Sequence, residues 1–362
     1  MSKKHLFKNF AVLSCAAMLL LSGCQSSPDT AKDSSQTPAT NSSAETGAES
    51  NTDTNKDTNK DTNKDTNGDT DKTANTSAET GDNITVTDAR GEISIPANPQ
   101  KIVDISGNSD ILSVLGYKVA GTANSDAYDY TKFPSYLEDV LEGASILGYS
   151  MQDTMDVEGI ISLEPDLIII STVQEKMYQQ LSEIAPVVIL ELAQTDWKED
   201  VKSVAGIMNK TAKADQWLSS YEEKALKIGE EIRSSYGEDT TYLALLASGG
   251  QIFIFDKAGI GSILYDDMGL KRPEGMPVQE NISLPVVSYE GLAQIDADRI
   301  LAIGTDEDLA SLRENPVWKN MEPVKNGNVL ELPSSPYFNQ GYSCIGRSLF
   351  LDEASSLMEK LK

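Results

Sequence analysis

The chain has 362 residues, with 56 Asp and Glu against 30 Lys and Arg, so its formal net charge at pH 7 is −26. Residues 82–362 carry most of this charge, with 45 acidic and 22 basic side chains. Such an acidic body repels nucleic acid and anionic lipid, which excludes both as partners. The only histidine is His5, so a mature chain that lacks His5 cannot use histidine for catalysis or metal binding. The sequence has three cysteines, which excludes a cysteine-based zinc site.

Residues 1–23 have the layout of a bacterial lipoprotein signal peptide. Lys3, Lys4 and Lys8 precede an apolar run that ends at Leu21 and is too short to span a bilayer comfortably. The next residues are Ser22-Gly23-Cys24, and the junction resembles a lipobox. The resemblance implies cleavage before Cys24, removal of His5 and a diacylglycerol on the Cys24 sulfur. The alternative is an ordinary signal peptide with an incidental cysteine.

Residues 24–81 are predicted to be a disordered tether. This segment has almost no large apolar side chains, and it repeats Asp-Thr-Asn-Lys from Asp53 onward. It therefore cannot bury a core. A calcium-binding interpretation is disfavoured because the repeat lacks the glycine turn and terminal glutamate of a calcium loop. A lipid anchor followed by such a tether predicts a protein on the extracytoplasmic face of the membrane, in an envelope without an outer membrane.

Residues 82–205 are predicted to form an α/β lobe. Apolar runs bounded by turn residues indicate strands, and helical spacing follows them. A strand, a helix and a second strand form a βαβ unit, for which a parallel pair is the default. The predicted elements are a hairpin of 84–88 and 92–95, strands at 102–105, 119–121, 167–170 and 187–190, and helices at 108–115 and 173–184.

A long helix is predicted to connect this lobe to a second one. Apolar residues recur at helical spacing over 211–236, a run of roughly 39 Å at 1.5 Å per residue. A helix predicted at 196–208 precedes this run and is a candidate to join it, and we assign residues 206–238 to the connection. The alternative is a long surface helix. The second α/β lobe, 239–362, is predicted to contain strands at 241–247, 252–255, 300–303 and 328–332, helices at 260–268 and from 342 onward, and a loop at 333–341.

One short pattern occurs twice, once in each predicted lobe. The first copy runs from Glu158 to Ile169 and the second from Glu290 to Leu301, with glutamate, glycine, an apolar residue, aspartate and an apolar pair in the same order. Each copy is predicted to open a short helix at a capping residue, Asp156 or Ser288, and to lead into a buried strand. Each glutamate then lies at the second helical position, near the surface of its lobe.

Four features together resemble those of one family. They are the lipobox, the repeated Glu-Gly pair, the long helix, and the sequence Leu-Glu-Pro-Asp at 163–166, which leads into a strand. The chain is similar to the class III substrate-binding lipoproteins of ABC importers, which carry iron-siderophores or vitamin B12. The resemblance implies two α/β lobes with mainly parallel sheets, one long connecting helix and a ligand cleft between the lobes. It also implies that Glu158 and Glu290 dock onto arginines of a membrane permease, which works with its ATPase.

Ligand-binding residues are expected in loops at the carboxyl ends of the parallel strands, where open α/β sheets bind ligands. Tyrosine and arginine in these loops suit a flat chelate with oxygen ligands. The candidates are Asn108, Ser109, Tyr128, Thr172, Gln174, Ser248, Arg272, Tyr337, Tyr342 and Arg347.

The resemblance implies that the ligand is a ferric siderophore, captured outside the cell by a monomer that holds no permanent cofactor and no directly bound metal. The negative body favours a neutral or cationic hydroxamate complex over an anionic catecholate. Cobalamin or another iron chelate is the alternative ligand. An enzyme is disfavoured because the sequence has no mature histidine and no Gly-x-Ser-x-Gly elbow. A structural surface lipoprotein is also disfavoured, since two cleft-forming lobes are not needed for that role.

Overall fold

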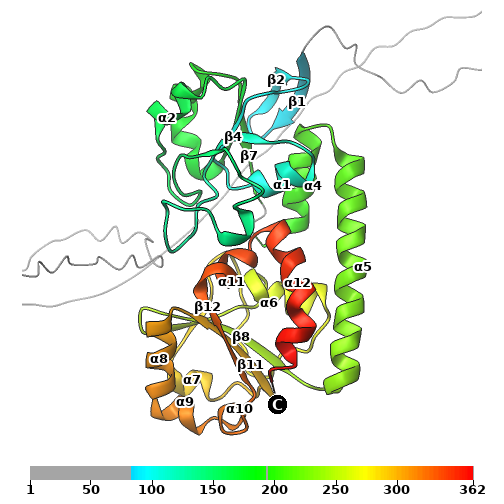
Figure 1. Cartoon of the computed structure of the whole chain (residues 1–362), viewed down its shortest axis with the longest axis vertical. Coiled ribbons are helices and arrows are strands. Elements are labelled where there is room, and N and C mark those ends of the chain that lie inside the picture. Colours follow the sequence, from blue (N-terminus) through cyan, green and yellow to red (C-terminus); the bar gives the residue numbers. More distant parts are fainter. Residues whose placement is uncertain (1–82, 193–194, 362) are drawn as a thin grey trace, which may run out of the picture. The chain divides into compact units, whose positions relative to one another are not determined.

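The computed structural model describes residues 83–192 and 195–361, so the predictions for the signal peptide, Cys24 and the tether lie outside the described residues. The described part begins with the predicted hairpin, β1 (Asn83–Asp88) and β2 (Gly91–Pro96), which pair antiparallel. Two five-stranded sheets follow, one in each half of the chain (Figure 1). Within the residues described, no helix combines the length and the apolar character needed to cross a membrane.

The first lobe contains a sheet in which all neighbouring strands are parallel, as the βαβ pattern predicts. Its strand order is β5-β4-β3-β6-β7, and every residue of β6 is buried, which agrees with its continuous apolar run. The strands are β3 (Ile102–Asp104), β4 (Val119–Thr122), β5 (Ser145–Ile146), β6 (Leu167–Ser171) and β7 (Val187–Leu190).

The helices of the first lobe include one correction to the sequence analysis. The single helix predicted at 173–184 is a 3-10 helix followed by a short α-helix. Gln174 accounts for the tight first turn, because its side-chain oxygen accepts hydrogen bonds from the backbone and hydroxyl of Ser171. The helices are α1 (Ser109–Val114), η1 (Ser135–Leu137), α2 (Val157–Ser162), η2 (Thr172–Met177), α3 (Tyr178–Ser182) and α4 (Trp197–Ile207).

The second lobe contains a mixed sheet of order β10-β9-β8-β11-β12. Strands β8, β11 and β12 are parallel, whereas β9 turns back antiparallel to β8 through Gly249 and Gly250. Both glycines have positive φ, 57° and 77°, a conformation that other residues rarely adopt. The strands are β8 (Tyr242–Ser248), β9 (Gln251–Ile254), β10 (Val286–Val287), β11 (Arg299–Gly304) and β12 (Val329–Pro333).

The helices of the second lobe include three that the sequence analysis did not predict, α8 to α10, between β11 and β12. The predicted helix at 260–268 is an α-helical turn, α6, that continues as a π-helix, η3. The elements are α6 (Gly259–Ser262), η3 (Ile263–Asp267), α7 (Tyr289–Leu292), α8 (Asp306–Glu314), α9 (Pro316–Asn320), α10 (Glu322–Lys325), α11 (Ser334–Gln340) and α12 (Cys344–Met358).

The segment 333–341 is not a loop, as predicted, but carries the helix α11. Pro333 precedes the first residue of this helix, and Pro336 opens its regular part, because Ser335 before it has non-helical angles of φ −99° and ψ 127°. Prolines read as loop signals in the sequence, yet the first turn of a helix tolerates them because its N–H groups have no intrahelical acceptor.

The long helix α5 (Thr211–Tyr236) has the predicted bounds and connects the two lobes (Figure 1). Its early residues Ala214 and Leu218 belong to the hydrophobic core of the first lobe, whereas Ala225 and Ile232 belong to that of the second. Gly229 lets the helix approach η3 closely, because a Cβ atom at this position would lie 1.8 Å from the carbonyl oxygen of Met268. One helix thus contributes to both cores.

The repeated pattern forms the same local structure in both lobes. As predicted, Asp156 and Ser288 cap α2 and α7 by accepting hydrogen bonds from the backbone N–H groups of Gly159 and Gly291. The aspartate at the end of each copy holds the start of the neighbouring strand. Asp166 accepts from the backbone N–H groups of Gln100 and Lys101 before β3. Asp298 accepts from the backbone N–H and hydroxyl of Thr241 before β8.

Asp298→Ala should lower the free energy of unfolding by about 1 to 2 kcal/mol, because the Thr241 N–H and hydroxyl lose a charged acceptor. Thermal unfolding of the purified chain measures this change. Asp296→Ala is the matched control, since Asp296 lies two residues earlier and is exposed like Asp298, but the Thr241 N–H donates to the Asp298 carboxylate. Equal melting temperatures for the two variants would show that Asp298 does not hold β8.

Candidate functional site

The two lobes meet where α11 contacts the loop that follows β4. The carboxylate of Asp126, which is buried, accepts hydrogen bonds from the Ser335 hydroxyl and from Nδ2 of Asn339, the latter at 3.1 Å. The Asn339 side-chain oxygen in turn accepts from the backbone N–H of Ala127 at 3.2 Å. Sequence reasoning did not single out Asp126, and its role depends on the unpredicted helix α11.

A second contact between the lobes lies at the start of α12. The Ser343 hydroxyl donates to Oδ2 of Asp110 at 2.7 Å and also caps α12 by accepting from the backbone N–H of Gly346. Cys344, whose function the sequence does not indicate, packs in the hydrophobic core of the first lobe. Burial raises the pKa of the Cys344 thiol well above its usual value. This keeps Cys344 in the thiol form.

An aromatic group lies at this junction and is formed by both lobes: Tyr128 from the first, and Phe338 and Tyr342 from the second. We call these three residues the interlobe aromatic group. The rings of Tyr128 and Phe338 are 5.9 Å apart and nearly perpendicular, and those of Phe338 and Tyr342 are 5.3 Å apart. Tyr128 is 40% exposed and Tyr342 is 41% exposed. Two of the ten predicted ligand-binding residues are thus linked through Phe338 and face solvent.

Asn108 and Ser109 lie at the carboxyl end of β3, as predicted, but they are buried in a polar network around Asp104. The Asp104 carboxylate accepts from the backbone N–H of Asn108 at 3.0 Å and from the Ser109 hydroxyl at 2.6 Å. The Asn108 side chain donates to the Ser106 hydroxyl. Burial raises the pKa of Asp104, and these hydrogen bonds partly oppose that rise. Both residues therefore shape the loop that precedes α1.

Gln174 and Thr172 follow β6, again at the predicted place. Gln174 is fully buried, and its Nε2 donates to the carbonyl oxygens of Ser150 and Gln152. It therefore fixes the loop after β5 against the end of β6. Thr172 is exposed beside it, and Ser248 is half-buried at the end of β8.

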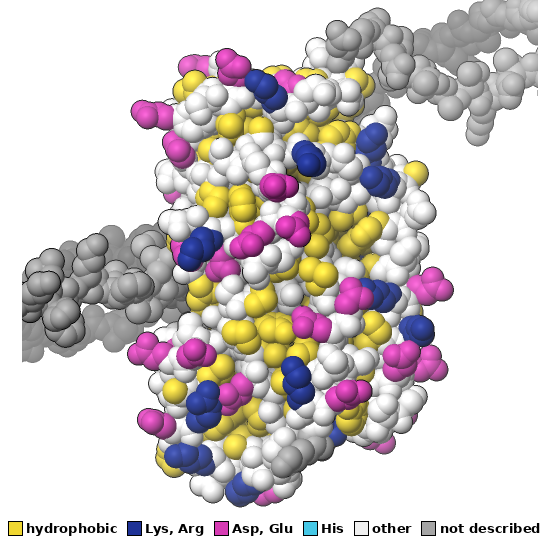
Figure 2. Space-filling model, in the orientation of Figure 1, with side chains coloured by type: hydrophobic (Ala, Val, Ile, Leu, Met, Phe, Trp, Pro, Cys, Tyr) yellow, Lys and Arg dark blue, Asp and Glu magenta, His cyan; other side chains and the backbone are white. Residues whose placement is uncertain are grey.

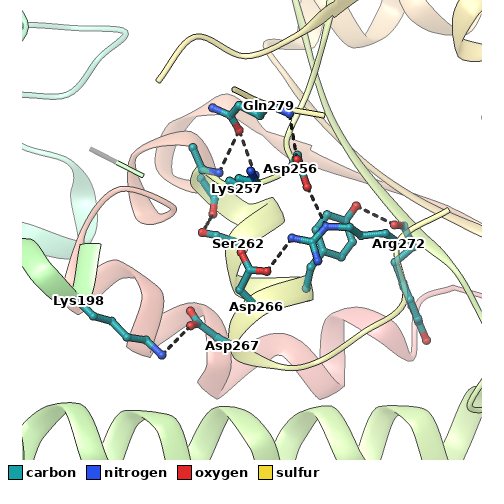
Figure 3. A network of polar contacts seen from close by, with 12 residues as sticks. Lys198, Asp256, Lys257, Ser262, Asp266, Asp267, Arg272 and Gln279 are labelled. Atoms are coloured by element: carbon teal, nitrogen blue, oxygen red, sulfur yellow. Dashed lines mark hydrogen bonds and ion pairs between the residues drawn. The ribbon is translucent and has the colours of Figure 1, made fainter. Parts of the chain in front are cut away.

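Arg347 lies inside the protein, with 3% of its surface exposed. Its guanidinium donates to Oδ2 of Asp267 at 3.0 Å and to the Ser262 hydroxyl at 2.6 Å. Lys198, from α4, lies 3.4 Å from the other oxygen of Asp267 (Figure 3). The Tyr221 hydroxyl, from α5, also donates to Asp267. This buried network joins α4, α5, η3 and α12.

Arg272 and Tyr337 are also engaged with carboxylates. Arg272 donates from Nε to Asp256 at 2.8 Å and from a terminal nitrogen to Asp266 at 2.7 Å (Figure 3). The Tyr337 hydroxyl donates to Glu353 at 3.0 Å. The cationic groups of both predicted arginines, Arg272 and Arg347, are thus neutralised by acids of the protein itself.

Glu158 and Glu290 occupy the second positions of α2 and α7, and both are exposed. Figure 2 shows acidic side chains spread over one face of the molecule with Lys and Arg among them. The structure therefore presents one surface glutamate per lobe at matching places in the repeat.

Two α/β lobes joined by one long helix, with exposed aromatic side chains from both lobes at their junction, are the architecture of a two-lobed binding protein. A family model described as periplasmic binding protein matches residues 106–336. The chain belongs to this family. Membership confirms the prediction of a binding protein rather than an enzyme, and the predicted fold of two α/β lobes and one long connecting helix is also confirmed.

Relatives from Bacillus subtilis cover most of the folded part. The probable siderophore-binding lipoprotein YfiY is 28% identical over 275 residues, which cover 72% of this chain and 83% of that protein. The iron(3+)-hydroxamate-binding protein FhuD is 28% identical over 290 residues, covering 77% and 88%. The crystal structure of the petrobactin-binding protein YclQ has a TM-score of 0.61 and 25% identity, and covers 76% of this chain and 99% of that one.

Proposed function

We propose that the chain is the substrate-binding component of an ABC importer, which captures a ferric siderophore and delivers it to a membrane permease. The observation that carries the proposal is the interlobe aromatic group, because exposed rings from both lobes form a surface on which a planar chelate can stack. The names of the relatives supply the ligand class, since they bind siderophores or ferric hydroxamates.

A neutral or cationic hydroxamate complex is the favoured ligand. Arg347 and Arg272, the two arginines expected near the ligand, are paired with Asp267, Asp256 and Asp266. Their charge is therefore already compensated and offers little attraction to a triply anionic catecholate. The excess of acidic residues over 82–362 acts in the same direction.

Attachment to the extracytoplasmic face of the membrane through Cys24 is part of the proposal. It is supported by the lipobox and by the lipoprotein relative YfiY. Delivery to the permease is assigned to Glu158 and Glu290, which extend from α2 and α7 and suit arginine partners.

Titration with three ferric complexes tests the ligand. Ferrioxamine B, which is cationic, and ferrichrome, which is neutral, should quench the intrinsic fluorescence and raise the melting temperature, whereas anionic ferric enterobactin should do so weakly. At a ligand concentration of 100 times Kd, binding adds about 2.7 kcal/mol to the free energy of unfolding. Tight binding of ferric enterobactin alone would contradict the hydroxamate assignment, and binding of none of the three would contradict a siderophore-binding function.

Matched variants in the same titration test the interlobe aromatic group. Tyr128→Ala with Tyr342→Ala should weaken binding of the hydroxamate complex by about 2 kcal/mol, or roughly 30-fold, because two stacking surfaces are removed. Leu226→Ala is the control, since Leu226 is an exposed apolar side chain on α5. Unchanged affinity in the double variant would place the ligand elsewhere.

A further inference from the structure

The second copy of the repeat contains another exposed acid, Asp296, six residues after Glu290. The first copy has Glu164 at the equivalent place, six residues after Glu158. The last acid of each copy has a structural role, because Asp166 and Asp298 hold β3 and β8. Among the described residues, the backbone N–H groups at the starts of β3 and β8 donate to Asp166 and Asp298 and not to the middle acids, Glu164 and Asp296. The Glu164 side chain is 82% exposed, and its ion pair with Lys101 is a surface contact of the kind that contributes little to stability.

Asp296 lines a surface hollow of about 600 Å³ beside α7. Its walls are residues 293–297 and parts of α9 and α10, including Asn320 and Glu322. A second hollow, of about 350 Å³, lies along residues 286–290 and includes Glu290 itself. One hollow thus includes the start of α7 and the other begins directly after its end, and each is lined by an acidic residue.

The charge of the larger hollow has one sign. Of the described residues that line it, Asp296 and Glu322 are charged and none is Lys or Arg. Glu322 contacts Lys325 at 3.4 Å, but the Glu322 side chain is 77% exposed, so the pairing leaves its carboxylate open to a partner. A shallow, acid-lined hollow next to an exposed glutamate fits a protruding basic segment of a protein, because opposite charges on the two surfaces fix the register of docking.

We propose that the permease-docking surface of the second lobe extends from Glu290 across α7 into this hollow, where Asp296 and Glu322 contact a basic segment of the permease. The inference rests on the proposed docking role of Glu290. The hollow is assigned to the permease because it begins directly after α7, the helix that carries Glu290. Both copies of the repeat have an acid at the equivalent position, Glu164 or Asp296, which agrees with a docking function for this part of the pattern.

Uptake of radiolabelled ferrioxamine B by cells tests the inference. The chain's own gene is replaced by variants, and surface abundance and in vitro affinity for ferrioxamine B are measured alongside. Asp296→Lys with Glu322→Lys should reduce uptake about tenfold, with affinity and abundance unchanged. The matched control is Glu223→Lys with Glu230→Lys, two exposed acids on α5 that change the net charge equally and should leave uptake intact.

The outcomes separate the inference from the function on which it rests. Normal uptake in the Asp296 and Glu322 variant overturns the inference, and so does an equal loss in the α5 control, which would indicate a general effect of charge. If reversal of Glu158 and Glu290 blocks uptake while reversal of Asp296 and Glu322 does not, docking stands without the hollow. If wild-type cells do not take up ferrioxamine B and the chain does not bind it, the result contradicts the proposed function with this ligand, and with it the inference that rests on that function.

Discussion

Cells whose chain carries Glu158→Lys together with Glu290→Lys should lose uptake of radiolabelled ferrioxamine B, although the purified variant binds ferrioxamine B with wild-type affinity. Each glutamate is exposed on a short helix of its own lobe, α2 or α7. Neither helix contains a residue of the interlobe aromatic group. Charge reversal turns an attraction for a permease arginine into a repulsion in both lobes at once. Like charges brought together at an interface cost several kcal/mol, so docking should fail.

The control for this experiment changes one exposed acid per lobe, Glu142→Lys and Glu307→Lys, outside the repeat. It should leave uptake and affinity unchanged. Single reversals at Glu158 or Glu290 should give intermediate uptake, because one docking contact remains. Wild-type uptake by the double variant would show that the two glutamates only complement the dipoles of their helices, an effect of about 0.3 to 1 kcal/mol each.

The sequence was sufficient to predict features whose cause is local. The caps Asp156 and Ser288 are followed by glycine and apolar residues at helical spacing, and both form the expected bonds. Strand β6 could be predicted because its apolar run continues without a polar residue until Ser171. The bounds of α5 followed from one uninterrupted helical pattern. In each case the signal and the structure lie within a few residues of each other.

The candidate site could be predicted only in part, because it depends on contacts between distant segments. Tyr128 and Tyr342 were singled out as loop tyrosines, but Phe338 joins them only because the segment predicted as a loop carries the kinked helix α11. Asp126 lies more than 200 residues from its partner Asn339. Residues so far apart share no helical or strand periodicity, so the sequence pattern could not predict which of them meet at the junction of the lobes.

Arginine shows the same limit more sharply. Arg347 was expected at the ligand because it was assigned to the loops at the carboxyl ends of the parallel strands, where an arginine suits a chelate with oxygen ligands. In the structure its guanidinium faces Asp267, which is 80 residues earlier in the chain, and it also stacks 4.7 Å from the ring of Trp197. A sequence shows that an arginine is available but not which acid neutralises it. Its role toward the ligand therefore stays a prediction, whereas its role in the buried network can be tested directly.

Asp267→Asn should lower the free energy of unfolding by about 3 to 5 kcal/mol, because it leaves the buried Arg347 without its counter-charge. Lys198 faces the same carboxylate but keeps its ion pair with Glu222 at 2.9 Å, so Arg347 is the cation left without a counter-charge. Thermal and urea unfolding measure the loss. Asp266→Asn is the matched control: the neighbouring carboxylate pairs with Arg272 at a half-exposed position, and its loss should cost about 1 kcal/mol or less.

A second substitution distinguishes a missing charge from a general packing defect. Adding Arg347→Met to Asp267→Asn removes the unpaired cation and should recover a large part of the lost stability, since replacing both members of a buried ion pair by neutral groups is often tolerated. If the double variant is less stable than Asp267→Asn alone, the main contribution of Arg347 is its packing on Trp197 and its bond to Ser262. Because the network joins α4 and α5 to η3 and α12, recovery would identify charge balance as what fixes the connecting helix against the second lobe.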